Sequence, residues 1–303
     1  MAISRSQLVK ELEPGLNALF GLEYKRYENQ HAEIYTAESS DRAFEEEVML
    51  SGFGNAQVKG EGSGVSFDEA QETFSARYTH ETVALAFAIT EEAIEDNLYD
   101  RLASRYTKAL ARSMSNAKQV KAVEPLIQGL PSTDNFDSGD GVSLFNTSHP
   151  TVAGTFKNTL STQADLNETS LEQSMIDIGK MTDERGLKIA ARGLKMIIPS
   201  ELQFTAERLM KSQGRTGTAD NDINAIVSMG MVPQGYRVNN YLTDTDAFYI
   251  LTDVPNGMKM FNRAPLTTAM EGDFDTGNVR YKARERYSFG VSDPRGIFAS
   301  QGA

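Results

Sequence analysis

A glycine-rich turn between two polar segments is the feature that most constrains how this chain can fold. Three of the five residues from Gly60 to Gly64 are glycine, which adopts the positive φ angles that a tight chain reversal needs. The flanking segments, residues 51–59 and 65–89, are polar, so they predict a long hairpin that cannot form a core of its own. Such a hairpin is a liability in a monomer, and we therefore expect another subunit to cover it.

The composition is that of a globular protein and excludes several kinds of site. The chain has 303 residues, enough for one large domain or two modest ones, and 40% of them are hydrophobic. No apolar run approaches the roughly 20 residues that span a bilayer, and Met1–Lys10 lacks the apolar centre of a signal peptide. Without cysteine there are no disulfides, thiolate nucleophiles or cysteine metal ligands. The three histidines lie far apart in the sequence, so we expect neither a metal site nor a cofactor.

The charge is acidic overall but unevenly distributed along the chain. A net charge of −12 argues against a general nucleic-acid-binding protein, which would carry a basic surface. From Arg101 to Lys121, however, every charged residue is basic, and Arg101, Arg105, Lys108 and Arg112 follow helical spacing on one face. Two interpretations stay open: a solvated helix face, or a basic stripe that meets an acidic neighbour or nucleic acid.

The periodicity of apolar residues predicts a mixed α+β fold. Apolar residues recur every four positions from Ile94 to Met114, which predicts a helix from Thr90, its N-cap, to about Gln128. Strict alternation over about a dozen residues from Val279 predicts a long half-buried strand, with Glu285 as a carboxylate on its apolar face. Shorter helices are predicted at residues 4–19 (interrupted at Pro14–Gly15), 170–183 and 200–211, and short strands at 195–199, 236–238 and 247–251.

The order of these elements resembles the major capsid proteins of tailed phages with the Hong Kong 97-type fold. The residues that carry the resemblance are the helix opening Ile89–Glu92, the strand–proline–helix passage Met196–Ser200 and the ending Gly290–Phe298. The stretch Phe145–Pro150 looks most like the Mu-like prophage major head subunits. The likeness covers nearly the whole chain in order and length, but no single motif is diagnostic by itself.

The resemblance implies an α+β fold made of four parts. These parts are an N-terminal arm (1–50), an E-loop hairpin lying over the neighbouring subunit (51–89), a peripheral (P) domain with the long spine helix and long strands (90–129 and 254–289), and an axial (A) domain (130–253 and 290–303). Each arm and hairpin laid on a neighbour then contributes one weak interface, and closure of a shell multiplies these interfaces.

The resemblance also implies a function and a set of partners. As the major capsid subunit of the virion, the chain would assemble with itself as hexamers and pentamers into an icosahedral shell enclosing phage double-stranded DNA. We expect a separate scaffolding protein, because the hairpin begins too close to the N-terminus for a fused scaffolding domain, and also a portal and a decoration protein. Assembly would take place in the host bacterial cytoplasm, with only weak non-specific contact to DNA, no contact with a membrane and no enzymatic activity.

Three residues match a covalent crosslink of the founding member of this fold, in which a hairpin lysine joins a P-domain asparagine with the help of a glutamate. Lys59 lies on the predicted hairpin, Asn278 opens the last long strand, and Glu285 follows seven residues later, the same relative spacing. In an apolar pocket the lysine would be neutral and would attack the carboxamide carbonyl, releasing ammonia. The alternative is that Lys59 is a solubilising charge, Asn278 a turn residue and Glu285 the partner of an arginine. Most shells of this fold do not crosslink.

A cluster of carboxylates precedes the last long strand. Glu271, Asp273 and Asp275 lie in one loop, which the resemblance places near the local three-fold contacts of the shell. They either meet basic residues or a cation at a neighbouring subunit, or form a plain solvated turn, and the sequence leaves both interpretations open.

Other classes of protein fit the sequence less well. An encapsulin-type cargo compartment has the same fold but usually begins with a helix that takes part in cargo docking, and residues 3–19 show no clear match. A hydrolase would need His149 to act beside Ser148, with Asp137 or Asp140 upstream, but a nucleophile adjacent to its base rarely has the right geometry, and the G-x-S-x-G motif is missing. Tail-tube and fibre proteins are mostly β, which the long helix contradicts.

Overall fold

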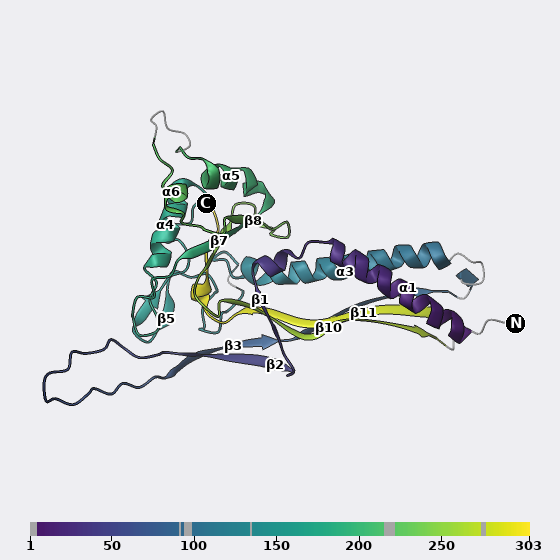
Figure 1. The fold of residues 1–303 in the computed structure, drawn as a ribbon, viewed down its shortest axis with the longest axis horizontal. Helices are drawn as coiled ribbons and strands as arrows, with labels where there is room; N and C mark the ends of the chain where they lie inside the picture. Colours follow the sequence, from purple (N-terminus) through teal and green to yellow (C-terminus); the bar gives the residue numbers. More distant parts are fainter. Residues whose placement is uncertain (1–4, 91, 94–98, 134, 215–221, 274–276) are drawn as a thin grey trace.

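The computed structural model describes residues 5–90, 92–93, 99–133, 135–214, 222–273 and 277–303, with the side chains of all of these except 5–12 and 99–102. An elongated part built of long strands and two helices carries a more compact part at one end (Figure 1). A thin hairpin runs along the side of the elongated part and projects past the compact part (Figure 1). None of the described helices is long and apolar enough to cross a bilayer.

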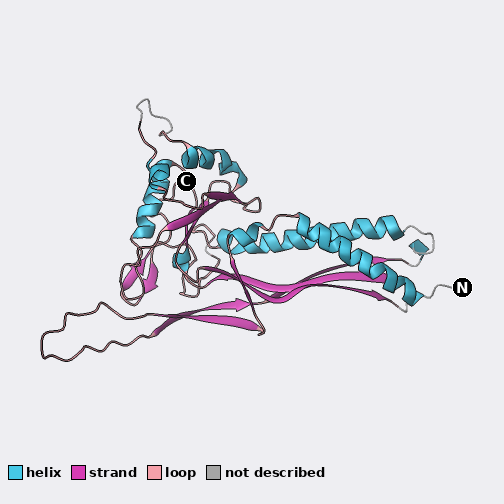
Figure 2. Cartoon of the chain, in the orientation of Figure 1, coloured by secondary structure: helices cyan, strands magenta, loops and turns pink. Residues whose placement is uncertain are grey.

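A four-stranded sheet forms the elongated part. Its strands, in spatial order, are β1 (Thr36–Ser39), β10 (Met258–Gly272), β11 (Val279–Val291) and β4 (Glu81–Ile89). β10 and β4 run antiparallel to β11, and β1 runs parallel to β10. Two helices, α1 (Arg5–Arg26) and α3 (Tyr99–Gln128), lie together along one face of this sheet (Figure 2).

The alternation of apolar and basic residues along β11 explains why the helices lie on one face of the sheet. The strand has the bounds that the sequence predicts. Val279, Tyr281, Ala283, Glu285 and Tyr287 are buried, and the basic residues between them are exposed or half-buried. The buried side chains meet Leu110 and Met114 of α3, which follow the predicted four-residue spacing. The start of the predicted helix lies partly outside the described residues, but the Thr90 hydroxyl does accept a hydrogen bond from the Ala93 N–H at 3.4 Å.

Helix α1 corrects the sequence prediction at this end of the chain. We expected a helix over residues 4–19 that is interrupted at Pro14–Gly15, but α1 runs unbroken from Arg5 to Arg26 through Pro14. Proline removes one helical hydrogen bond, yet Pro14 lies on the exposed side of α1. Leu16 and Phe20 in the following turns are buried against α3 and β11, and this packing holds the helix together.

The compact part contains a second four-stranded sheet. Its strands, in spatial order, are β12 (Ile297–Ser300), β9 (Phe248–Thr252), β7 (Gly193–Ile198) and β8 (Tyr236–Val238). Around it lie α4 (Glu168–Gly179), α5 (Gln203–Lys211), α6 (Ala225–Met229), the small hairpin β5 (His149–Thr151) and β6 (Gly154–Phe156), and the short 3-10 turns η2 (Ser200–Leu202) and η3 (Pro294–Gly296). The sheet has its own apolar core with α4, α5 and α6. Because β12 is the end of the chain, the C-terminal residues return to this part after the long strand.

The projecting hairpin differs from the prediction in its bounds. Its strands are β2 (Phe44–Leu50) and β3 (Glu72–Thr79), which pair antiparallel, and residues 51–71 between them form no regular strand. The predicted hairpin of residues 51–89 thus begins too late and ends too late, because β4 pairs with β11 in the elongated sheet. The physical reason is that Val83 and Phe87 alternate along β4 and pack against the helices, which a free hairpin arm cannot offer.

Candidate assembly surfaces

The distal part of the hairpin is polar overall but carries several large apolar side chains that its own chain does not cover. Its large apolar side chains Leu50, Phe53, Val58, Val65 and Phe67 are between 61% and 100% exposed. Exposed apolar groups that gather on one projecting segment mark a contact site rather than ordinary surface scatter. Lys59 lies in this segment with its side chain exposed.

Two sets of contacts fix the hairpin to the body of its own chain. At the base, Glu47 forms an ion pair with the nearly buried Lys259, and the Tyr78 ring packs edge-on against Phe261 at 4.8 Å. Farther out, the Arg185 guanidinium donates hydrogen bonds to Asp68 Oδ1 at 2.9 Å and to the backbone carbonyl of residue 69 at 2.7 Å. These contacts fix the direction of the hairpin, while no hydrogen bond, ion pair or ring contact joins its tip to the rest of the described chain.

Three basic residues in the first half of α3 lie on one exposed face of the helix. Arg105, Lys108 and Arg112 are exposed, and none of their side chains forms an ion pair or hydrogen bond with another residue that the structure describes. The side chain of Arg101 lies outside the described residues. Both interpretations of the sequence, a solvated helix face and a stripe that meets a partner, therefore stay predictions.

The acidic loop is described only in part. Glu271 is exposed at the end of β10, and Asp273 forms an ion pair with Arg280 of its own chain. Asp275 lies outside the described residues. Among the residues that are described, no three histidine or carboxylate side chains gather in a cluster that could hold a metal ion.

The three crosslink candidates do not meet within one chain. Glu285 is buried between β11 and the two helices, 2% exposed, and its Oε2 lies 3.1 Å from the Lys118 ammonium and 3.4 Å from the Tyr24 hydroxyl. Burial raises the pKa of Glu285, although Lys118 acts in the opposite direction. Asn278 precedes β11, and its backbone carbonyl accepts a hydrogen bond from the N–H of Asp273. Lys59 lies in the segment between β2 and β3, near the glycine-rich turn. The geometry favours a structural role for Glu285.

Lys118 is the partner that sequence reasoning missed. It falls in the basic stretch of α3, but it continues the four-residue spacing of Leu110 and Met114 and so belongs to the buried stripe. A lysine on an apolar helix stripe and a glutamate on an apolar strand face are the signal that could have predicted this pair. The Lys118 ammonium also lies 5.0 Å from the centre of the Tyr287 ring.

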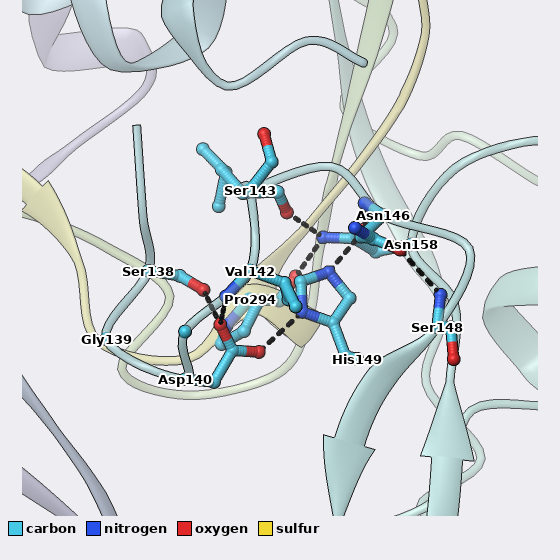
Figure 3. A network of polar contacts seen from close by, with 12 residues as sticks. Ser138, Gly139, Asp140, Val142, Ser143, Asn146, Ser148, His149, Asn158 and Pro294 are labelled. Atoms are coloured by element: carbon cyan, nitrogen blue, oxygen red, sulfur yellow. Dashed lines mark hydrogen bonds and ion pairs between the residues drawn. The ribbon is translucent and has the colours of Figure 1, made fainter. Parts of the chain in front are cut away.

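His149 lies in a closed polar network instead of an open catalytic site (Figure 3). Its Nδ1 is 2.6 Å from Asp140 Oδ2 and its Nε2 is 2.9 Å from Asn158 Oδ1, so both ring nitrogens already have partners. The imidazole is fully buried, and the hydroxyl of the neighbouring Ser148 is no part of the network. The geometry therefore contradicts the hydrolase interpretation, which needs a serine hydroxyl on the free nitrogen of the histidine.

The network has a structural role that can be traced residue by residue. Asn158 donates from Nδ2 to the backbone carbonyls of Leu144 at 2.7 Å and Pro294 at 3.0 Å, which joins the loop before β5 to the end of the chain. Burial alone would raise the pKa of Asp140, but the hydrogen bond from His149 lowers it below its ordinary value. The His149 ring also stacks on Phe156 at 4.7 Å.

Comparisons with known proteins agree with this architecture. The procapsid protein of bacteriophage JBD30 superposes with a TM-score of 0.53 at 14% identity, covering 98% of this chain and 76% of that one. The capsid protein of Myoviridae phage XM1 gives a TM-score of 0.52 at 12% identity, covering 89% of each chain. A virus-like particle from Pyrococcus furiosus gives 0.51 at 12% identity, covering 94% and 97%. No curated protein matches the sequence.

These likenesses confirm the predicted α+β fold of the Hong Kong 97 type, while the special likeness to Mu-like prophage subunits stays a prediction. Their low identity carries the fold and no more. The family is shown by the sequence itself, because the model of the family described as phage capsid protein matches residues 73–300. The chain is therefore a structural subunit of a phage head and belongs to the phage capsid protein family.

Proposed function

We propose that this chain is the repeating subunit of an icosahedral shell, in which it forms hexamers and pentamers around phage double-stranded DNA. The observation that carries the proposal is the hairpin tip, whose apolar side chains have no cover in their own chain. Burying one such side chain contributes about 1.5–3 kcal/mol, so a neighbour that covers several of them gains enough for a stable contact. A closed shell repeats that contact in every subunit.

The parts of the chain would divide the work of assembly. In this proposal residues 1–43 are the arm, the hairpin of residues 44–79 is the E-loop in place of the predicted 51–89, residues 81–129 (with β4) and 254–289 form the P domain, and residues 130–253 and 290–303 form the A domain. The hairpin is anchored at its base by Glu47 on Lys259 and farther out by Arg185 on Asp68, and these contacts support this division because they fix the direction in which the tip projects. Pre-ordering of this kind lowers the entropy that each subunit loses when it joins the shell.

The partners beyond the subunit itself are part of the same proposal. A separate scaffolding protein would guide assembly in the host bacterial cytoplasm, and a portal and a decoration protein would complete the head. The net charge of −12 supports only weak, non-specific contact with the packaged DNA, since an acidic wall repels phosphate.

Electron microscopy of the purified protein, with light scattering for particle mass, tests the proposal. Closed shells or rings of five and six subunits are expected, and a variant with Phe53→Ser and Phe67→Ser should remain monomeric, because its hairpin tip has lost apolar surface. A protein that stays monomeric at high concentration, alone and in lysates of phage-infected cells, would contradict the proposal. Particles filled with protein cargo and free of nucleic acid would instead support the encapsulin-type alternative.

A further inference from the structure

A cavity lies where the hairpin passes the compact part (Figure 1). Its walls come from the end of β2, the loop between α4 and β7, the turn after β9 and the 3-10 turn η3. Its volume is about 360 Å³, which falls within the roughly 300–1,000 Å³ of small-molecule sites. The cavity is therefore large enough for a small organic molecule.

The lining of this cavity combines apolar walls with acidic side chains. The hairpin and the compact part both supply apolar groups, which include Met49, Leu50, Ile189 and Val254. The ionisable residues of the lining are Asp183, Glu184, Asp253, Asp293 and Arg295. Four carboxylates against one guanidinium leave the cavity with an excess of negative charge. Such a lining favours a ligand that joins positive charge to an apolar chain.

Arg295 does not balance this charge, because its single guanidinium already serves two of the carboxylates. Its Nη2 pairs with Glu184, and its Nη1 lies 3.2 Å from Asp293 Oδ1. Its Nε donates to the backbone carbonyl of Thr182 at 2.8 Å, and its guanidinium lies over the Phe156 ring at 4.3 Å from the ring centre. One buried cation thus faces two buried carboxylates, and one negative charge of this group stays unbalanced.

Glu184 is the carboxylate that lacks a donor. The residue is 2% exposed, and its Oε2 has no hydrogen-bond partner in the part of the chain that the structure describes. A buried carboxylate oxygen without a donor costs free energy. Burial also raises the pKa of Asp293; the charge of Arg295 opposes this shift, and the charge of Glu184 adds to it. A positively charged donor in the cavity would satisfy Glu184 and offset the repulsion between the two carboxylates.

Two further carboxylates lie at the same cavity, nearer to solvent. Asp183 is half-buried and Asp253 is exposed. Each uses its Oδ1 to accept backbone hydrogen bonds, Asp183 from Arg185 and Leu187, and Asp253 from Arg192. Neither carboxylate forms an ion pair with another residue that the structure describes. The cavity therefore offers negative charge both at its buried end and near its rim.

The carboxylates are arranged for an organic cation rather than for a metal ion. Among the described residues, no three histidine or carboxylate side chains form a group that could hold a metal ion. The ligand that fits has positive charges separated by an apolar chain, because its ammonium groups can donate to separate carboxylates while its methylenes lie against the apolar walls. A linear alkyl diamine or polyamine has this chemistry.

We infer that this cavity binds a linear alkyl diamine or polyamine. One ammonium group donates to Glu184 at the buried end, the methylene chain packs against Ile189 and Val254, and a second ammonium group lies near Asp183 or Asp253 at the rim. The site needs only one folded chain, so the inference does not rest on the proposed function. Because the walls belong to both the hairpin and the compact part, the bound amine holds these two parts together.

Isothermal titration calorimetry of the full chain at low ionic strength tests the site. Putrescine, which has two ammonium groups on a four-carbon chain, should bind saturably at one molecule per chain, and added salt should weaken the binding. Butane-1,4-diol has the same chain without charge and should not bind. Putrescine should also raise the midpoint of thermal unfolding, because it binds the folded chain only.

Two variants locate the bound amine. Glu184→Gln keeps the shape of the side chain but removes its charge, and it should weaken putrescine binding by about tenfold or more. Asp253→Asn at the exposed rim keeps an acceptor for the Arg192 N–H and should weaken binding by a smaller factor, about threefold. This second variant keeps the test decisive if Glu184→Gln does not fold. The matched control is Glu201→Gln, which removes an exposed carboxylate of the compact part outside the cavity.

Binding that both cavity variants weaken and the control leaves unchanged supports the site. No saturable binding of putrescine, or equal affinity in the unaltered protein and all three variants, overturns it. Nα-acetyl-lysine amide, which has one ammonium group on the same four-carbon chain, should bind more weakly than putrescine. If it binds as tightly, the cavity accepts a lysine side chain of a partner protein and the polyamine inference is wrong. None of these measurements involves shell assembly, so their failure leaves the proposed function standing.

Discussion

Lys118 and Glu285 form a charge pair in the interior of the elongated part. Removing one partner of such a pair destabilises the folded state, because the other charge stays buried and unpaired. Glu285 is 2% exposed and its Oε1 has no hydrogen-bond partner among the described residues. We predict that Lys118→Met lowers the free energy of unfolding by about 3–5 kcal/mol, because it leaves a buried carboxylate unpaired. The double variant Lys118→Met with Glu285→Leu should recover most of this loss. Urea unfolding of the three proteins measures it, and an unchanged midpoint in Lys118→Met would contradict the prediction.

His31, a residue of the N-terminal arm that lies against α3, makes stability depend on pH. Burial of the imidazole, aided by the charge of Lys118, lowers the pKa of His31 from 6.5 to about 4. The unfolded chain therefore binds more protons between these two values, and the folded state loses stability as the pH falls from 6.5 towards 4. The full shift corresponds to about 3 kcal/mol.

The variant His31→Phe isolates this effect. Phenylalanine keeps the edge-on ring contact with Phe289 but cannot take up a proton. Unfolding free energies measured at pH 7 and pH 4.5 should differ by less in the variant than in the unaltered protein. Glu285 acts in the opposite direction, because its raised pKa favours the neutral form as the pH falls. An equal pH effect in both proteins would assign the acid sensitivity to other groups.

At the scale of single residues, the sequence predicts positions better than partners. The place of Glu285 on the apolar face of a strand follows from its spacing alone, and the structure confirms it. Its partner Lys118 is 167 residues away, and the one sequence signal for the pair is that Lys118 continues the apolar stripe of α3; the packing of α3 on β11 is needed to show that the two residues meet. In the same way, the histidine at 149 could be predicted as a packing residue, but its contact with Asn158 depends on the loop that brings residue 158 back.

At the scale of elements, strong periodicity decides which predictions hold. The long strand at 279–291 and the helix ending at Gln128 follow from alternation and four-residue spacing, and both have those bounds in the structure. The predicted bounds of the hairpin are wrong because the sequence of β4 is equally compatible with a hairpin arm and with a strand of the elongated sheet. Only the pairing of β4 with β11 decides between the two. The predicted interruption of the helix at Pro14 is also wrong, because the tertiary packing of α1 outweighs the local effect of a proline.

The distal hairpin is also an element whose loss should leave the rest of the chain intact. Residues 52–70 touch the body through Asp68 and the carbonyl of residue 69, both on Arg185. We predict that replacing 52–70 with a short glycine–serine turn changes the unfolding free energy by less than about 1 kcal/mol, because exposed ion pairs contribute little. Assembly should be lost completely. Chemical unfolding and light scattering measure the two effects, and an assembling deletion variant would contradict the role of the hairpin.

At the scale of the whole molecule, the chain has two apolar cores that its own residues cover and several surfaces that its own residues leave exposed. The cores of the elongated and compact parts are closed, and the network around His149 and Asn158 ties the C-terminal end to the loops before β5. The hairpin tip, the exposed basic residues of α3 and the exposed side of β4 remain uncovered. A shell subunit needs this arrangement, because each chain can fold by itself and then bury its exposed surfaces against neighbouring subunits.

The position of Glu285 in the covered core bears on whether the subunits of the shell are crosslinked. A crosslink through Lys59 and Asn278 needs a glutamate that the incoming lysine can reach, but Glu285 lies beneath α1 and already pairs with Lys118 and Tyr24. Opening this site would expose a buried core and leave the Lys118 ammonium unpaired. We therefore predict that mature particles run on a denaturing gel as one band at 33.3 kDa. A ladder of higher masses that disappears in Lys59→Arg would show that a neighbour's lysine finds another general base, and would assign catalysis to a carboxylate at the subunit interface.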